Sequence, residues 1–282
     1  MDVPKVVPKI GASPKPAPWF WKASLDRYPL EFWSEVIAYQ LGEVAGVEVP
    51  PCFPSVCEET YGSLSHFFVD RFAGEFLVHG GDLFAELRPG YDRKRGREHS
   101  VQLVLDAMAV FARPTHFEKL FEQFVFDGLI GNGDRHQDNW GVVIRPEGKD
   151  IRKWPERLAP TFDNGTSMAR EVTETNVDNM LQDSMRFEAY LNRGKSHVRW
   201  EEEGELIEVT HEDLMARILL MRPNLRSTAE RILNFDLVRA RSVLERIGAL
   251  SQTCSGVEIS ETRQELMFRL ISRRRERLCA VL

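Results

Sequence analysis

The chain has 282 residues, of which 43% are hydrophobic and 28% are charged. This balance is typical of a folded protein with one large or two modest domains, and it excludes globally disordered, collagen-like and coiled-coil chains. The net charge of −6 excludes the overall basic character of nucleic-acid-binding proteins, so no direct nucleic-acid partner is expected. The four cysteines are scattered and contain no C-x-x-C pair, which argues against a disulfide framework and a zinc knuckle.

The N-terminal 18 residues predict a proline-punctuated loop, with prolines at positions 4, 8, 14, 16 and 18. They contain no apolar core of the kind found in signal peptides. No apolar run in the chain reaches the roughly 18–20 residues that a membrane span needs. We therefore expect a cytoplasmic protein with no membrane contact.

The next part of the chain predicts a small mixed α/β unit. Trp19–Lys22 is typical of a strand, and a helix is predicted over Glu31–Ala45 because Gly46 can take the left-handed conformation that ends a helix. A second strand is predicted over Ser65–Phe72. Residues 73–100 are expected to be irregular, and they contain the basic cluster Arg88, Arg93, Lys94, Arg95 and Arg97.

From residue 101 onward the pattern is mainly helical. Helices are predicted over 101–111 and 116–130, the second with a buried stripe of Phe117, Phe121 and Phe124. Extended segments are predicted at 140–144 and 158–162. Further helices are predicted near 178–192, 211–221, 224–233, 235–249 and 259–281.

Two polar segments carry the residues that point to chemistry. In the stretch 131–140, which lies between a predicted helix and a predicted strand, Asp134 precedes Asn139 by five positions. This spacing matches the catalytic Asp and the metal-binding Asn of a kinase catalytic loop. Asp163 with Gly165 matches the Asp-x-Gly that holds metal in the same enzymes. Taken alone, an Asp and an Asn in a loop usually form turns, but three matching positions in the correct order favour phosphoryl transfer.

The segment Asp-Arg-His-Gln-Asp-Asn (134–139) resembles the catalytic loops of phosphatidylinositol 3-kinases and of bacterial HipA-like Ser/Thr kinases. The stretches 35–51 and 158–167 are similar to the HipA-like group in particular. The resemblance implies an α+β, two-lobed, protein-kinase-like fold. Its small N-lobe would span residues 1–72 and its mainly helical C-lobe residues 73–282, with ATP and Mg²⁺ bound in the cleft between them.

The resemblance also assigns residues to the nucleotide site. Lys22 would contact the ATP phosphates, Glu35 would pair with Lys22, and Phe68, Val69 and Asp70 would form the hinge beneath the adenine. Backbone N–H groups of Gly11, Ala12 and Ser13 would cradle phosphate, although this stretch has a single glycine. Unlike HipA toxins, which carry a further region before the ATP loop, this chain begins close to that loop.

Other polar residues have simpler interpretations. His136 is expected to be structural and to tie the catalytic loop to the backbone near Asp163, with metal ligand or base as the alternative. Asp138 is expected to be solvated or to cap a turn. The basic cluster at 88–97 and the acidic run Glu201–Glu203 are expected to be solvated.

The function predicted is an ATP- and Mg²⁺-dependent kinase acting on a protein Ser or Thr hydroxyl, including its own. One alternative is a phosphatidylinositol or small-molecule kinase, which the net negative charge and the small basic cluster disfavour. Another is a nucleotide-binding pseudokinase, disfavoured because all five motif residues are present. The protein substrate is not identified by the sequence, and a regulatory, antitoxin-like partner is possible by the resemblance.

Overall fold

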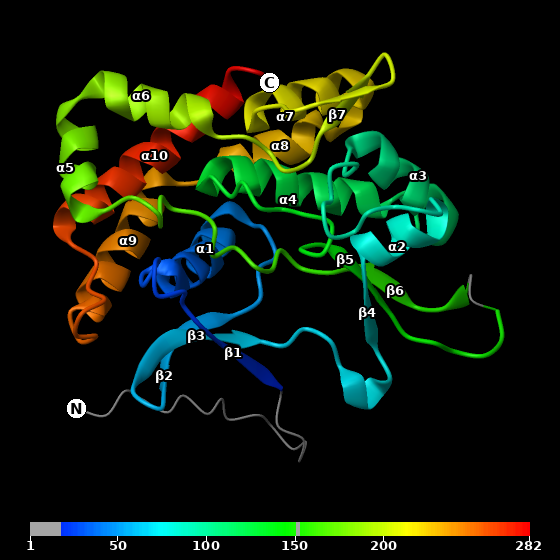
Figure 1. The fold of residues 1–282 in the computed structure, drawn as a ribbon, viewed down its shortest axis with the longest axis horizontal. Helices are drawn as coiled ribbons and strands as arrows, with labels where there is room; N and C mark the ends of the chain where they lie inside the picture. The colour runs from blue at the N-terminus through cyan, green and yellow to red at the C-terminus, as the bar shows by residue number, and fades with distance from the viewer. Residues whose placement is uncertain (1–17, 151–152) are drawn as a thin grey trace.

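The computed structural model describes residues 18–150 and 153–282, which place two three-stranded sheets on one side and, on the other, a helical layer that also carries a short hairpin (Figure 1). The first elements are β1 (Trp19–Ala23), α1 (Glu31–Ala45), β2 (Cys52–Cys57), β3 (Thr60–His66), the 3₁₀ turn η1 (Arg71–Ala73), β4 (Phe76–His79) and α2 (Gly80–Leu87). The middle elements are α3 (Val101–Phe111), α4 (His116–Ile130), β5 (Gly141–Ile144), β6 (Glu156–Leu158), α5 (Glu174–Gln182) and α6 (Ser184–Arg193). The last elements are β7 (Trp200–Glu202), β8 (Glu205–Ile207), α7 (His211–Met221), η3 (Pro223–Leu225), α8 (Arg226–Leu233), α9 (Leu237–Ser251) and α10 (Glu261–Cys279).

The first sheet is antiparallel with the order β1-β3-β2, and α1 packs against it. β1 is rich in aromatic residues, as strands commonly are, and Lys22 lies opposite Ser63 on β3. Side chains two positions apart share one face of a strand. Phe20 and Lys22 consequently point into the same cleft.

The second sheet, also antiparallel, has the order β4-β5-β6 (Figure 1) and brings the two polar segments together. Segment 131–140 leads into β5, and the segment that carries Asp163 follows β6. Val142 near the start of β5 pairs with Leu158 at the end of β6. Because the start of one strand and the end of its antiparallel neighbour meet at the same sheet edge, the two segments lie side by side.

The central helix α4 is surrounded by α7, α8 and α10 and is buried along most of its length. The predicted stripe Phe117, Phe121 and Phe124 is confirmed as core, with at most 5% of each side chain exposed. Gly131 ends the helix with φ +71°, and a Cβ there would lie 2.1 Å from the Arg274 side chain. Glycine is therefore required where the chain leaves α4 and enters the polar segment 131–140.

Three predictions about the elements need correction. Residues 73–100 contain β4 and α2, and the strand predicted over Ser65–Phe72 ends at His66, which pairs with Trp19, the first described strand residue of β1. The helix predicted at 178–192 is two helices, since Asp183 caps the start of α6. The acidic run at 201–203 lies in the β7-β8 hairpin, where Glu202 and Glu203 are exposed, as expected of a solvated run. The lobe boundary between residues 72 and 73 stays a prediction.

Within residues 18–150 and 153–282, no helix combines the length and apolar character needed to cross a membrane.

Candidate active site

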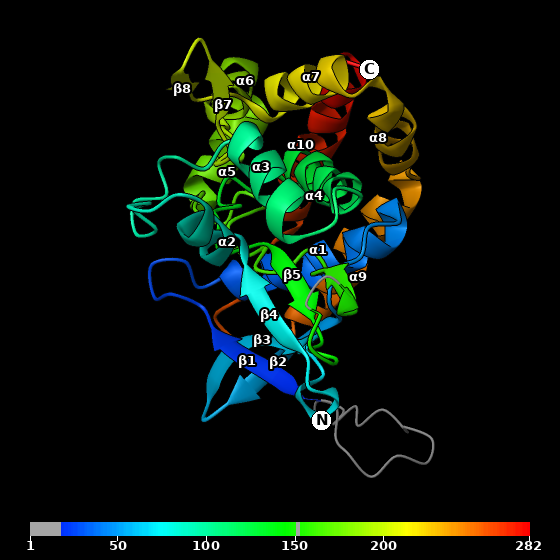
Figure 2. The same ribbon diagram turned by 90° about the vertical axis from the view of Figure 1, so that its right-hand side faces the viewer.

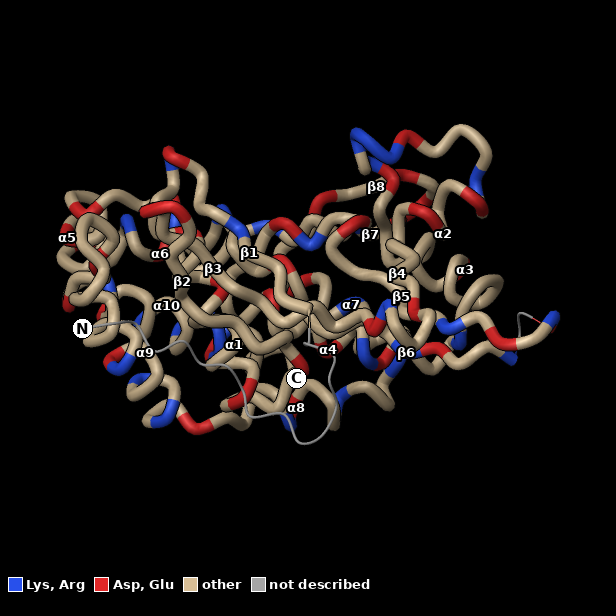
Figure 3. The backbone as a smooth tube through the Cα atoms, turned by 90° about the horizontal axis from the view of Figure 1, so that it is seen from below, with Lys and Arg blue, Asp and Glu red and all other residues tan. Residues whose placement is uncertain are grey.

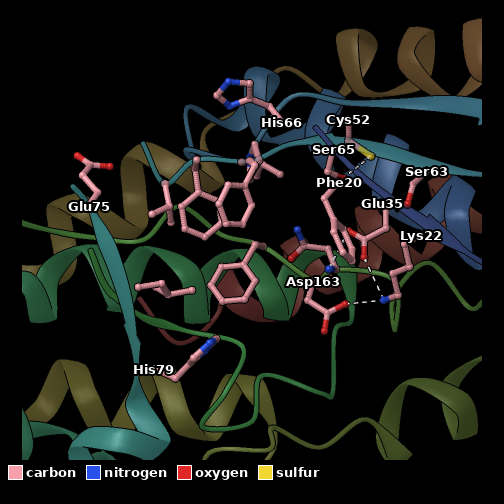
Figure 4. A pocket seen from close by; sticks show the side chains of 18 of the residues that line it. Phe20, Lys22, Glu35, Cys52, Ser63, Ser65, His66, Glu75, His79 and Asp163 are labelled. Atoms are coloured by element: carbon pink, nitrogen blue, oxygen red, sulfur yellow. Dashed lines mark hydrogen bonds and ion pairs between the residues drawn. The ribbon is translucent and has the colours of Figure 1, made fainter. Parts of the chain in front are cut away.

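A cleft of about 920 Å³ is lined by β1, β2, β3, β4 and the segments 67–69 and 162–164 (Figure 4). This volume is within the range of small-molecule and cofactor sites. Five of the predicted site residues line it: Lys22, Glu35, Phe68, Val69 and Asp163. The cleft thus brings together residues as far apart in the sequence as Phe20 and Asn164.

Lys22 lies among three carboxylates at one end of the cleft. Its Nζ donates to Asp163 Oδ1 at 2.7 Å and lies 3.8 Å from Glu35 Oε1 and 3.6 Å from Glu31 Oε1. Burial opposes the positive charge, but the carboxylates outweigh it and raise the pKa of Lys22 above its ordinary value. The predicted contact of Lys22 with Glu35 is present at ion-pair distance, although Asp163 is the nearer partner.

Glu35 is buried on α1 and is held by the segment that follows Asp163. Its Oε2 accepts a hydrogen bond from the backbone N–H of Asn164 at 2.9 Å. Burial, followed by the nearby Asp163 carboxylate, raises the pKa of Glu35 to about 7, while Lys22 and the amides of Asn164 and Gly165 act in the opposite direction. Glu35 is therefore poised to titrate near neutral pH.

Glu31, which the sequence analysis missed, lies one helical turn before Glu35 on the same face of α1. It forms ion pairs with Lys22 and with Arg170. Gly165 packs between the two acids, and a Cβ there would lie 2.9 Å from Glu31 Cγ. The i, i+4 spacing of the two glutamates is the signal that could have identified Glu31.

Asp163 stands in the left-handed backbone region with φ +55°, which is uncommon for a residue other than glycine. Burial alone would raise its pKa, but Lys22, and then Arg135, lower the pKa of Asp163 below its ordinary value. The side chain is consequently ionised. Among the described residues, only its Oδ1 has a hydrogen-bond partner, so Oδ2 is free to bind a cation.

Asp134 and Asn139 lie on one loop that is held closed by hydrogen bonds. Asn139 Nδ2 donates to the Asp134 carbonyl at 2.9 Å, and the Asp134 N–H donates to Asn132 Oδ1 at 3.1 Å. The five-residue spacing thus places the two side chains on one turn. Thr166 Oγ1 donates to Asp134 Oδ2 at 3.3 Å, so a hydroxyl already lies against the predicted catalytic carboxylate.

Arg135 connects both polar segments, and the sequence analysis missed it. Its guanidinium pairs with Asp127 through two hydrogen bonds of 2.9 and 2.8 Å, and both side chains are 2% exposed. It also donates to the carbonyls of Asn139 and Phe162 and to Asn164 Oδ1. An acid at position 127 on the apolar face of α4 was the available signal for this pair.

His136 does not make the link to the backbone near Asp163 that the sequence analysis expected, because Arg135 makes it. His136 Nδ1 instead accepts from the Asp138 N–H at 3.1 Å. Its ring meets the His197 ring edge-on, with the ring centroids 5.9 Å apart. Asp138 is not simply solvated, since its Oδ1 accepts from Arg93 Nε at 2.9 Å.

The far end of the cleft is apolar and is formed in part by Phe68, Val69 and Phe162. The rings of Phe68 and Phe162 lie 5.2 Å apart at 36°. Asp70 does not line this cleft; its side chain caps η1 by accepting from the N–H groups of Phe72 and Ala73. The predicted phosphate-cradling residues Gly11, Ala12 and Ser13 lie outside the described residues.

The oxygen donors of the site fit a hard divalent cation such as Mg²⁺. Asp163 Oδ2 and the amide oxygen of Asn139 accept no hydrogen bond from the described residues, and both are ligand types that Mg²⁺ prefers. The described part of the chain contains no group of three or more His, Cys, Asp or Glu side chains arranged to hold a metal. A cation at this site would therefore complete its shell with phosphate and water, as Mg²⁺ does in phosphoryl-transfer enzymes.

Comparisons with known proteins agree with this architecture. The model of the HipA-like C-terminal domain family matches residues 3–231. The fold is similar to the crystal structure of the Helicobacter pylori proinflammatory kinase CtkA, with a TM-score of 0.69 and 19% identity over 93% of this chain and 88% of that one. It is also similar to Shewanella oneidensis HipA, solved with HipB and operator DNA, with a TM-score of 0.50 and 13% identity over 92% of this chain and 57% of that one. A search of curated proteins finds no match.

The similarity to these two structures confirms the predicted two-lobed, kinase-like α+β fold. This chain spans little more than half the length of the Shewanella chain.

Proposed function

Because the chain belongs to the family of HipA-like C-terminal domains, we propose that it is an ATP- and Mg²⁺-dependent kinase that phosphorylates Ser or Thr hydroxyls of proteins. One observation carries the proposal: Lys22 and Asp163 bond to each other in one cleft, and Arg135 and Thr166 tie the linked pair Asp134–Asn139 to the segment that carries Asp163. Direct transfer between bound ATP and a hydroxyl needs this combination of cation, metal ligands and carboxylate.

Each residue has a separate task in this proposal. Lys22 neutralises phosphate charge, and Glu35 holds the lysine in place. Asp134 orients the acceptor hydroxyl and accepts its proton. Asn139 and Asp163 hold Mg²⁺, which, when bound, neutralises charge on the phosphates. The apolar end near Phe68 and Val69 accommodates the adenine.

Lys22 must change partner during the reaction. Its bond to Asp163 occupies one oxygen of a proposed metal ligand, so binding of Mg²⁺ and ATP is expected to exchange this bond for contacts with phosphate. Glu35 and Glu31, both within 3.8 Å of Nζ, would keep the ammonium in the cleft during the exchange.

The experiment that tests the function compares labelled-ATP transfer to lysate proteins with transfer to phosphoinositide vesicles at matched enzyme and Mg²⁺. Labelled phosphoserine or phosphothreonine in protein, including the enzyme itself, is the expected result. Lipid labelling without phosphoprotein would support a phosphatidylinositol kinase, to which the Asp134–Asn139 segment is also similar. Nucleotide binding without transfer to any acceptor would identify a pseudokinase.

A regulatory protein partner stays a prediction, suggested by the HipB that accompanies HipA in the Shewanella complex. Co-purification of the full chain from its native cells would test it.

A further inference from the structure

The loop of residues 88–98, here called the basic loop, is fastened to the catalytic segment. Arg93 Nε donates to Asp138 Oδ1 at 2.9 Å, and Gln137 Nε2 donates to the Arg93 carbonyl at 2.6 Å. Gly96 packs directly on Gln137, since a Cβ at Gly96 would lie 2.5 Å from its Oε1. The basic loop therefore has a fixed position relative to Asp134.

Two cations of the basic loop take no part in this anchoring and have no charged partner among the described residues. Arg93 pairs with Asp82 and Asp138, while Arg88 and Arg95 have carboxylates at 4.0 and 3.5 Å. Lys94 and Arg97 are exposed, and neither forms an ion pair or side-chain hydrogen bond with any described residue. The loop projects beyond α2 in Figure 2, and its charges are visible in Figure 3.

A third free cation, Lys195, lies beside the catalytic segment. Its carbonyl is 3.2 Å from the position that a Cβ on Gly133 would take, next to Asp134. The Lys195 side chain is exposed and has no ion-pair partner within the described ranges. Backbone bonding of Arg199 to His99 joins the segment that carries Lys195 to the end of the basic loop.

A peptide whose hydroxyl contacts Asp134 can also extend to Lys94, Arg97 and Lys195. Gln137, the anchor of the basic loop, is three residues from Asp134, and the turns in this segment keep the two within the roughly 10 Å that an extended chain would span. Lys94 directly follows the anchored Arg93, and Arg97 directly follows the anchored Gly96. An extended substrate would therefore present side chains about three to six positions from its acceptor hydroxyl to these cations.

The surroundings favour a peptide over other polyanions. None of the exposed large apolar side chains of the described residues lies within 88–98 or 193–199, whereas cationic membrane-binding surfaces usually include apolar anchors. Asp92 and Glu98 interrupt the positive charge, and the whole chain carries a net charge of −6, which disfavours a continuous phosphate backbone. A short acidic stretch needs only two or three separate cations.

We propose that Lys94, Arg97 and Lys195 bind acidic residues of the protein substrate on either side of its Ser or Thr acceptor. This inference rests on the proposed kinase function and adds a substrate class to it. Complementary charge around the acceptor would select such segments and accelerate their association.

Binding and transfer should be measured separately. The probes are two fluorescent peptides with a central serine, one with glutamate at the third to sixth positions on both sides and one with glutamine there. Anisotropy at low salt should show the wild-type chain binding the glutamate peptide about tenfold more tightly. The triple variant K94E/R97E/K195E should lose this preference, and raised salt should weaken it in the wild type.

The control variant R226E/R239E/R246E reverses three other exposed cations, at the start of α8 and on α9, and should keep the preference. Equal affinity for the two peptides, or an unchanged preference in K94E/R97E/K195E, would overturn the inference. Tighter binding of single-stranded DNA or phosphatidylserine vesicles than of the glutamate peptide would overturn it as well. Labelled-ATP transfer then separates the two proposals, because a binding preference without transfer contradicts only the kinase function, and transfer without preference contradicts only the docking surface.

Discussion

The ammonium of Lys22 faces three carboxylates, those of Asp163, Glu35 and Glu31. A bound divalent cation would neutralise the excess negative charge. The ammonium is part-buried, with 38% of its side chain exposed, so it contributes more to electrostatics than to packing. A preorganised cation in such a cleft contributes most to catalysis where it neutralises charge on phosphate.

Replacing Lys22 with Met should therefore affect catalysis far more than folding. We expect transfer activity to fall about 10²–10³-fold, because a preorganised cation contributes about 2–4 kcal/mol to a developing charge. The midpoint of thermal unfolding should change by only a few degrees. Steady-state kinetics with a melting curve would check both, and normal kinetics would move the phosphate contact to another lysine, with Lys15 the next candidate.

The raised pKa of Glu35 predicts that the stability of the fold depends on pH. Its pKa of about 7 in the folded chain lies above the ordinary value of 4.5, so between these pH values the folded state holds a proton that the unfolded state releases. The contribution of Glu35 to the free energy of unfolding is greatest below pH 4.5 and falls as the pH rises to about 7.

The variant Glu35→Gln removes this titration. Its stability relative to the wild type should increase between pH 5.5 and pH 8, as urea unfolding of the ligand-free proteins would show. A constant difference between the two proteins at both pH values would mean that Glu35 titrates elsewhere.

Thr166 is placed to orient Asp134, the proposed catalytic carboxylate. Its hydroxyl donates to Asp134 Oδ2, and hydrogen bonds to charged groups contribute about 1.5–3 kcal/mol. Thr166→Val should lower kcat about tenfold or more with little change in KM for ATP, whereas Thr166→Ser should retain most activity. Equal activity of the valine and serine variants would show that the contact does not position Asp134.

At the scale of elements, α4 and the two polar segments behave as one unit because Arg135 bonds to all three. Removing one partner of a buried ion pair leaves an uncompensated charge, which costs about 3–5 kcal/mol. Arg135→Met should destabilise the chain by this amount, measured by chemical unfolding, and should reduce transfer as well. Arg246→Met, at an exposed position on α9, is the control and should change stability by less than about 0.5 kcal/mol; a similar small change for Arg135→Met would contradict the role assigned to the pair.

Local patterns predicted the long elements well. The helices over 31–45, 101–111 and 116–130 agree with α1, α3 and α4 because each has a clear apolar periodicity and an end signal. The helix α2 was missed because Gly80 and Gly81 usually break helices. Here packing requires the first of them, since a Cβ at Gly80 would lie 2.3 Å from the Trp140 ring.

The candidate site also contains some residues that the sequence predicts and others that it does not. Lys22, Glu35, Asp134, Asn139 and Asp163 could be predicted because motif spacing carries them. Arg135 could not, since its partners lie as far as 29 positions away and only the pairing of β5 with β6 brings them near. The hinge assignment failed at Asp70 for a local reason, because the side chain caps a 3₁₀ turn.

Across the whole molecule, α1 is bound firmly to the helical layer. One apolar core contains Phe32 and Trp33 of α1 together with Phe121 and Ile130 of α4, and the Trp33 indole donates to the Val257 carbonyl at 2.8 Å. Glu35 is consequently fixed to the same body as the catalytic segment.

The most direct test of the account compares Asp163→Ala with Asp134→Ala in two assays, Mg²⁺-ATP binding by calorimetry and phosphate transfer from labelled ATP. Asp163→Ala should lose nearly all transfer and should bind Mg²⁺-ATP more weakly, because the metal loses a charged ligand. Asp134→Ala should also lose transfer but should bind Mg²⁺-ATP nearly as well as the wild type, because Asp134 acts on the acceptor hydroxyl. Wild-type transfer by Asp163→Ala would contradict the assignment of the site.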